Sequence, residues 1–162
     1  MKKFILALGF IVVSLVVNAQ QEISYVVSFP NAVHHEAEIS MTIPNVPAGA
    51  LKVRMGRSSP GRYATHEFGK NIYNLKAFDA TGKALNFSLT QGDEYLIPNH
   101  GTTVKVTYTL FGNWIDGTYA GFDETHAHMN IPATFAFPVG MDNRPRIVKF
   151  NYAEKQNWKV AT

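Results

Sequence analysis

Apolar and polar residues alternate along most of the chain beyond residue 20, which is the pattern of strands that bury one face. The alternating stretches are 24–29, 36–43, 51–55, 72–78, 85–89, 102–111 and 147–152. Turn-forming residues separate many of them, including Pro44, Pro47, Thr81-Gly82 and Gln91-Gly92-Asp93. No stretch after the first 20 residues has a sustained 3.6-residue apolar repeat. We therefore expect an all-β fold, an antiparallel β-sandwich, with residues 113–140 forming one or two strands and long loops.

The first 19 residues have the composition of a cleavable secretory signal peptide. Lys2 and Lys3 precede an apolar run of about 14 residues, which is shorter than the ~20 residues that span a bilayer. Val17 and Ala19 suit the −3 and −1 positions of a cleavage site. We expect cleavage after Ala19, export to the periplasm or the cell exterior, no membrane attachment afterwards, and one domain over residues 20–162.

The charge of the chain has to be corrected for this signal peptide. The formal net charge is +3, and loss of Lys2 and Lys3 reduces it to +1. An exported, nearly neutral domain without a stripe of Lys and Arg is not expected to bind nucleic acid. The chain has no cysteine, which excludes disulfides and cysteine-based metal sites.

Residues 57–71 break the alternation and carry the densest chemistry in the chain. They combine a predicted turn with arginines, a histidine, a glutamate and aromatic residues. Long connections of this kind on a β scaffold often carry function. Pro60-Gly61 suits the centre of a type II turn. Such a turn would point four side chains away from the sheets: Arg62, Tyr63, His66 and Glu67.

The zinc-peptidase motif H-E-x-x-H is absent from this chain. His35-Glu36 is followed by Ile39 at the fifth position of the motif. His66-Glu67 is followed by Lys70 at the same position, and neither segment has helical periodicity. We therefore expect no catalytic residue and no cofactor within the chain.

A second place to look for a metal ion is the histidine pair His126 and His128. Two residues apart on a strand, both rings would lie on one face, and Asp123 and Glu124 nearby carry oxygen ligands. No third ligand has an evident position, so we favour an ordinary polar strand face and assign no metal. The histidine pair stays as the weaker alternative.

Several blocks of residues occur in a recognisable order. One runs Ser59-Pro60-Gly61-Arg62-Tyr63, then Glu67-Phe68 and Asn71. The others are 25–36, Ile43-Pro44, 79–85, 130–133 and 158–162. Together they resemble the N-terminal domain of the glycyl aminopeptidase family of zinc metallopeptidases (peptidase family M, number sixty-one). The resemblance covers nearly all of residues 20–162, with one departure: many members have a tryptophan where this chain has Ser58.

The resemblance implies a non-catalytic domain of a larger exported aminopeptidase. In that family a thermolysin-like catalytic domain, expected to lie outside this chain, carries H-E-x-x-H and binds zinc. The domain encoded here would pack against it and shape its cleft, so the expected partners are that catalytic domain and a peptide substrate. The implied substrate-rim or interdomain residues are Pro60, Gly61, Arg62, Tyr63, His66, Glu67 and Asn71. Glu67 is the candidate for holding a substrate amine. The alternative is a free-standing carbohydrate- or peptide-binding module.

Overall fold

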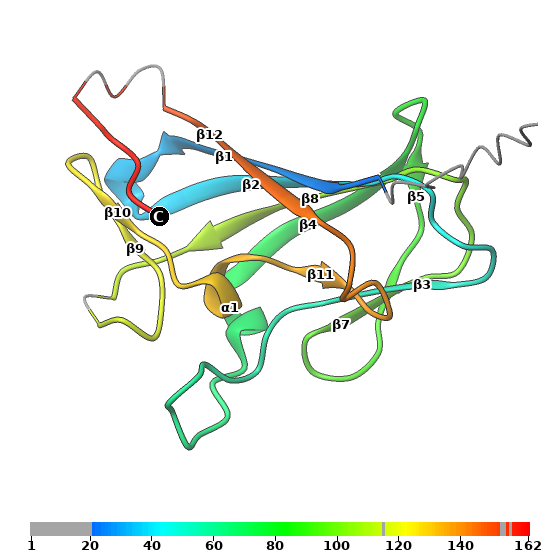
Figure 1. Cartoon of the computed structure of the whole chain (residues 1–162), viewed down its shortest axis with the longest axis horizontal. Helices are drawn as coiled ribbons and strands as arrows, with labels where there is room; N and C mark the ends of the chain where they lie inside the picture. The colour runs from blue at the N-terminus through cyan, green and yellow to red at the C-terminus, as the bar shows by residue number, and fades with distance from the viewer. Residues whose placement is uncertain (1–20, 115, 153–154, 156) are drawn as a thin grey trace, which may run out of the picture.

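Among the residues that the structure describes, almost all regular structure is β-strand (Figure 1). The strands form a six-stranded sheet, a four-stranded sheet and a two-stranded hairpin. The computed structural model describes residues 21–114, 116–152, 155 and 157–162, so the predicted signal peptide and its cleavage point lie outside the described residues. Within this part, no helix is long and apolar enough to cross a membrane. The expected all-β class is confirmed.

The larger sheet has the strand order β12-β1-β2-β8-β4-β5. Its members are β1 (Ile23–Asn31), β2 (Glu36–Ile43), β4 (Ile72–Asp79), β5 (Ala84–Leu85), β8 (Val104–Phe111) and β12 (Arg146–Asn151). All neighbouring strands are antiparallel except β1 and β12, which are parallel, with Tyr25 opposite Val148. The expectation of a wholly antiparallel fold is therefore wrong at this edge. All the other strands lie between these two in sequence, so the chain returns to β1 by a long crossover rather than a hairpin.

The alternation along the central strands determines which side chains are buried. In β1, Ile23, Tyr25 and Val27 are buried, while the residues between them are at least partly exposed. β2 keeps the same period and β8 largely does, with Ile39 and Val106 among the buried positions. These inward side chains form one hydrophobic core with buried residues of the four-stranded sheet. Burial of one face per strand therefore explains the period of two.

The smaller sheet has the strand order β11-β3-β7-β6. Its members are β3 (Leu51–Arg54), β6 (Ser88–Leu89), β7 (Glu94–Ile97) and β11 (Phe137–Pro138). Residues 85–89, expected as one strand, are split between the sheets, because β5 pairs with β4 whereas β6 pairs with β7. β7 is an addition to the predicted strands. It contains three consecutive apolar residues, Tyr95, Leu96 and Ile97, which do not alternate with polar ones, so a period of two does not identify it.

The described part of residues 113–140 contains three two-residue strands and one helical turn. They are β9 (Gly121–Phe122), β10 (Ala127–His128), α1 (Ile131–Thr134) and β11. Two buried tyrosines attach the end of α1 and the residues just after it to the larger sheet. Tyr25 Oη donates to Ala136 O at 2.9 Å, and Tyr108 Oη donates to Thr134 O at 2.8 Å. These bonds fix α1 against the inner face of the sheet.

Residues near both ends of the described chain are tied to the larger sheet. Arg144 donates from Nε to Gln21 O at 3.0 Å and from Nη1 to Pro44 O at 2.6 Å, just before β12 begins. Beyond β12, the Trp158 ring meets the Phe29 ring edge-on, with centroids 5.0 Å apart. The edge formed by β1 and β12 is thus held by contacts at each end.

Candidate functional site

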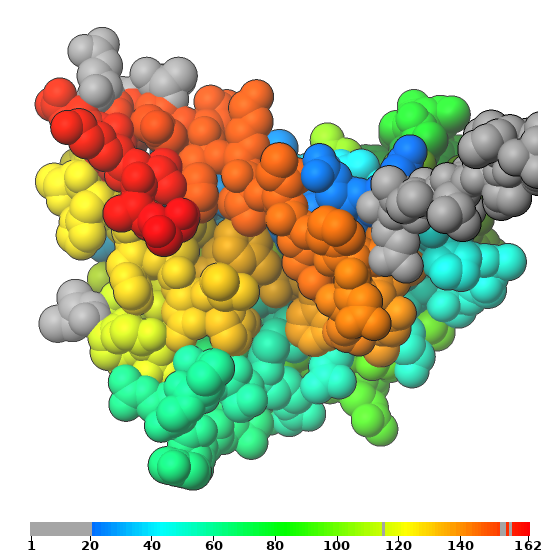
Figure 2. Space-filling view, viewed as in Figure 1, coloured from blue at the N-terminus to red at the C-terminus, as the bar shows by residue number. Residues whose placement is uncertain are grey.

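Residues 57–67 follow the end of β3 and form a loop, here called the tip loop, that projects at the lower edge of the molecule in Figures 1 and 2. Arg62 N donates to Ser59 O at 3.1 Å, and Gly61 has a φ of 77°, as the third position of a type II turn requires. The Tyr63 side chain has a relative exposure of 105%, so it is fully surrounded by solvent. The Pro-Gly pair therefore forms the turn that the sequence predicts.

Hydrogen bonds and ion pairs fix the base of the tip loop. His66 N donates to Arg57 O at 2.7 Å, which closes the loop. The Arg57 guanidinium pairs with Glu67 Oε1 at 2.9 Å and lies 3.8 Å from Asp93 Oδ2. Burial raises the pKa of Asp93, while the positive charge of Arg57 acts in the opposite direction. The tip loop therefore has an anchored base and an exposed end.

His66 turns inward, which corrects the expectation that it points away from the sheets. Its ring stacks on Phe68 with centroids 5.3 Å apart and meets the Tyr119 ring edge-on. Its Nδ1 lies 3.4 Å from Tyr119 Oη, and its Nε2 is buried without a partner among the described residues. The reason is aromatic packing: Phe68, fully buried at the start of the 3₁₀ turn η2 (Phe68–Asn71), draws the preceding residues inward.

The other predicted site residues divide between the tip and the base. Exposed at the tip are Pro60, Gly61, Arg62 and Tyr63. Glu67 lies at the base, where its backbone is left-handed (φ 49°) and its side chain is 58% exposed. Asn71 ends η2 and is buried, so its side chain packs inside the domain. The structure thus brings Arg62 and Tyr63 together at the surface and pairs Glu67 with Arg57.

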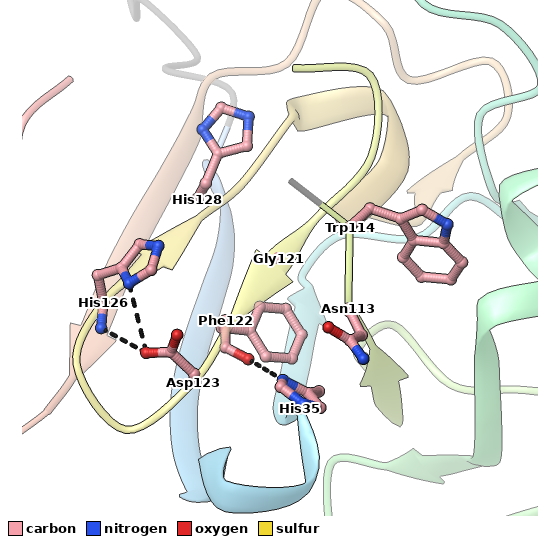
Figure 3. Close-up of a pocket in the computed structure, with 8 residues that line it drawn as sticks. All are labelled: His35, Asn113, Trp114, Gly121, Phe122, Asp123, His126 and His128. Atoms are coloured by element: carbon pink, nitrogen blue, oxygen red, sulfur yellow. Dashed lines mark hydrogen bonds and ion pairs between the residues drawn. The ribbon is translucent and has the colours of Figure 1, made fainter. Parts of the chain in front are cut away.

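A pocket of ≈ 150 Å³ lies beside the β9–β10 hairpin (Figure 3). Three histidines line it, His35, His126 and His128, together with Asp123 and Phe122. His35 follows the 3₁₀ turn η1 (Ala32–His34) with a left-handed φ of 61°, and its Nδ1 lies 2.8 Å from Phe122 O. The predicted histidine pair therefore shares a pocket with a third histidine from a distant part of the chain.

Asp123 organises the turn of this hairpin. Its Oδ1 accepts hydrogen bonds from Thr125 Oγ1 at 2.7 Å, from Thr125 N at 2.6 Å and from His126 N at 3.0 Å. These bonds, those from Thr125 foremost, hold the pKa of Asp123 well below its usual range. Glu124, the other oxygen donor considered, is exposed and outside the pocket wall. Over the described ranges, no three His, Cys, Asp or Glu side chains are arranged to hold a metal ion.

Comparison with known proteins places these features in a family. Residues 24–162 match the family model described as the peptidase M61 N-terminal domain. The chain belongs to this family. A crystal structure of an aminopeptidase N family protein from Idiomarina loihiensis has a similar fold, with a TM-score of 0.75 at 19% sequence identity. That similarity covers 80% of this chain and 22% of the other chain. No curated protein matches the sequence.

Two of the sequence blocks that carry the family resemblance meet in this M61 domain. Asn130, just before α1, donates from Nδ2 to Ser59 Oγ at 3.0 Å and to Thr118 O at 2.7 Å. Below the turn, Gly56 lies so close to α1 that an added Cβ would be 2.6 Å from Pro132 O. The tip loop and α1 therefore form one unit, and α1 is in turn bonded to the larger sheet.

The sequence of this M61 domain did not reveal the groups that support its two sites. Asp93 belongs to a predicted turn, and nothing in that turn indicates an ion pair with Arg57. In the sequence, His35 indicates only the start of an incomplete zinc-peptidase motif. Its position in the short connection between two predicted strands does indicate that it lies at the end of a hairpin. Tyr119, the partner of His66, lies in a stretch without a clear period. Each of these contacts depends on the packing of distant segments.

Proposed function

We propose that this M61 domain is the non-catalytic N-terminal domain of an exported zinc aminopeptidase and packs against a thermolysin-like catalytic domain. The family match over residues 24–162 supports the link to a peptidase. The aminopeptidase N family protein with the similar fold is much longer, since the shared part is 22% of its chain. Export is supported by the signal-like composition of residues 1–19, and zinc would be bound by the catalytic domain.

The tip loop is the observation that carries this proposal. Tyr63 stands at the end of a turn whose base is already fixed, so little conformational freedom is lost when a partner covers it. Arg62 beside it supplies a cation whose fork geometry suits a carboxylate on the partner. Burying an aromatic ring of this size against a neighbouring domain contributes ~1.5–3 kcal/mol. The tip loop therefore suits an interdomain contact that shapes a cleft.

Glu67 is the group in this loop that suits the free amine of a substrate. Arg57 holds its Oε1 atom at 2.9 Å, while the side chain stays more than half exposed. In the described part of the chain its Oε2 atom makes no hydrogen bond, so it can accept one from an ammonium group. In this proposal Glu67 lies at the rim of the cleft, beside the contact that Tyr63 makes.

One test asks whether this domain has peptidase activity of its own. The chain ending at Thr162 should hydrolyse no aminoacyl-p-nitroanilide, with or without added Zn²⁺, because it has no H-E-x-x-H motif. The reading frame beyond Thr162 should encode that motif, and its complete product should be a zinc-dependent aminopeptidase. Zinc-dependent turnover by the chain alone, or a reading frame without the motif, would refute the proposal in favour of a free-standing binding module.

A second test concerns Tyr63 in the complete product. Tyr63→Ala should lower kcat/KM about tenfold, which corresponds to roughly 1.4 kcal/mol of lost contact. Tyr63→Phe should keep the activity, because the ring rather than the hydroxyl is covered. Neither variant should change the free energy of unfolding of the domain, since the side chain is fully exposed. Equal kcat/KM values for Tyr63→Ala and the parent would show that the tip does not reach the cleft.

A further inference from the structure

We propose that the β9–β10 hairpin binds a divalent transition-metal ion such as Zn²⁺ through the imidazoles of His126 and His128, with Asp123 orienting His126. The hairpin places these side chains together: Asp123 N donates to His126 O at 3.0 Å, and His128 lies opposite Gly121. Residues opposite each other in an antiparallel pair share a face, as do residues two apart on one strand. All three side chains therefore line the same pocket (Figure 3).

The contacts of His126 favour the tautomer that a metal ligand needs. Its Nδ1 lies 3.3 Å from Asp123 Oδ1 and 2.9 Å from Thr125 Oγ1. The Thr125 hydroxyl donates its one proton to Asp123 Oδ1, so it can only accept a hydrogen bond from His126, and the imidazole proton therefore lies on Nδ1. Nε2 then carries a free lone pair. This carboxylate–histidine arrangement is the one that fixes the ring of metal-bound histidines.

His35, on another wall of the pocket, is held in a similar way. Its Nδ1 lies 2.8 Å from Phe122 O, a carbonyl that can only accept, so Nδ1 carries the proton and Nε2 a lone pair. Figure 3 shows its ring well apart from that of His128. We assign His35 to accept a hydrogen bond from water on the ion rather than to bind the ion itself.

Two protein ligands and solvent hold the ion in this proposal. Because no three His, Cys, Asp or Glu side chains of the described chain surround a common point, no third protein ligand is invoked. Imidazole suits zinc, copper and nickel, whereas magnesium and calcium prefer oxygen ligands. His128 is exposed and makes no hydrogen bond within the described ranges, so its ring is free to turn towards His126. Such an open site exchanges its ion with solvent.

Isothermal titration of the whole chain, stripped of metal with a chelator, tests the proposal with ZnCl₂ as the probe. One saturable site is expected, and MgCl₂ should show no binding. His126→Ala and His128→Ala should each weaken zinc binding at least about tenfold, and the double variant should abolish it. His34→Ala is the matched control, because His34 is exposed on η1 outside the pocket, and it should bind zinc as the parent does.

Asp123→Asn tests whether Asp123 acts by orienting the His126 ring rather than by binding the ion. We expect zinc binding to weaken about tenfold, and the ¹⁵N shifts of His126 in the metal-free protein to change from one tautomer to a mixture of two. All substituted side chains except Asp123 and His35 are exposed on a hairpin or turn, and circular dichroism should show parent-like folding. Unchanged zinc affinity in the double histidine variant would overturn the proposal. So would a loss in His35→Ala as large as the loss in His126→Ala.

Discussion

Replacing Tyr108 with phenylalanine tests how the larger sheet holds α1 and, through it, the tip loop. Tyr108 is 1% exposed on the inner face of β8. Its hydroxyl donates to Thr134 O at 2.8 Å and accepts from Ala136 N at 3.0 Å. Burial raises the pKa of Tyr108 well above its usual range, so the hydroxyl keeps its proton. Tyr108→Phe retains the ring but leaves both backbone groups without this partner in the core.

The expected cost follows from these two backbone groups. A buried polar group left without a partner costs ~1–3 kcal/mol. Allowing for some relaxation of the segment after α1, we expect Tyr108→Phe to lower the free energy of unfolding by about 2–4 kcal/mol. At roughly 3–4 °C per kcal/mol for a domain of this length, Tm should fall by about 6–16 °C.

Urea unfolding followed by tryptophan fluorescence measures this change. Tyr25→Phe, which loses the single bond to Ala136 O, should cost about half as much. Tyr63→Phe is the exposed control and should leave the unfolding midpoint unchanged. A Tyr108→Phe variant within about 0.5 kcal/mol of the parent would refute the view that these bonds hold α1 to the sheet.

Two further predictions concern the supports of the two sites. Gly69→Ala would place a Cβ 2.2 Å from Asp93 Oδ1, so it should lower the free energy of unfolding in urea by ~1–3 kcal/mol. Gly117→Ala is the control, because no atom lies within 4 Å of its added Cβ, and it should cost far less. Equal costs for the two variants would contradict the crowding argument. The Asp123 carboxyl should titrate below its ordinary pKa of 3.8 by NMR, so its stabilising effect is present above that pH and is lost as the pH falls below it. Thr125→Val should shift this midpoint up towards 3.8, and an unshifted midpoint would show that the threonine hydroxyl is not responsible.

The sequence predicted the strands whose two faces have different surroundings. β1, β2 and β8 bury one face in the core and turn the other outward. Apolar and polar residues therefore alternate along them, and this period of two identifies them in the sequence. Their partners were harder to predict. The parallel contact of β1 with β12 depends on the direction from which the chain returns, and local alternation carries no such information. Residues 85–89, predicted as one strand, belong to both sheets, because the alternation continues where the chain passes from β5 to β6.

The tip loop was predictable from its residue types, but its supports were not. Pro60-Gly61 specifies its turn locally, since one residue fixes φ near −65° and the other tolerates a positive φ. The inward position of His66 depends instead on the stacking of Phe68 and Tyr119, which only the folded chain brings together. The histidine pocket likewise combines three separate segments. The spacing of His126 and His128 predicts that they share a face, whereas only the folded chain shows that His35 lines the same pocket.

The parallel contact between β1 and β12 also sets an order of assembly. Gln21 and Arg144, which bond across this edge, are 123 positions apart in the chain. At ~5–20 residues per second, β1 is synthesised roughly 6–25 s before its partner strand exists. During that interval the outer edge of β1 has backbone donors and acceptors that another extended chain can pair with. The first strand to be made is therefore the one whose outer edge is covered last, and a chain that lacks β12 leaves this edge open to pairing.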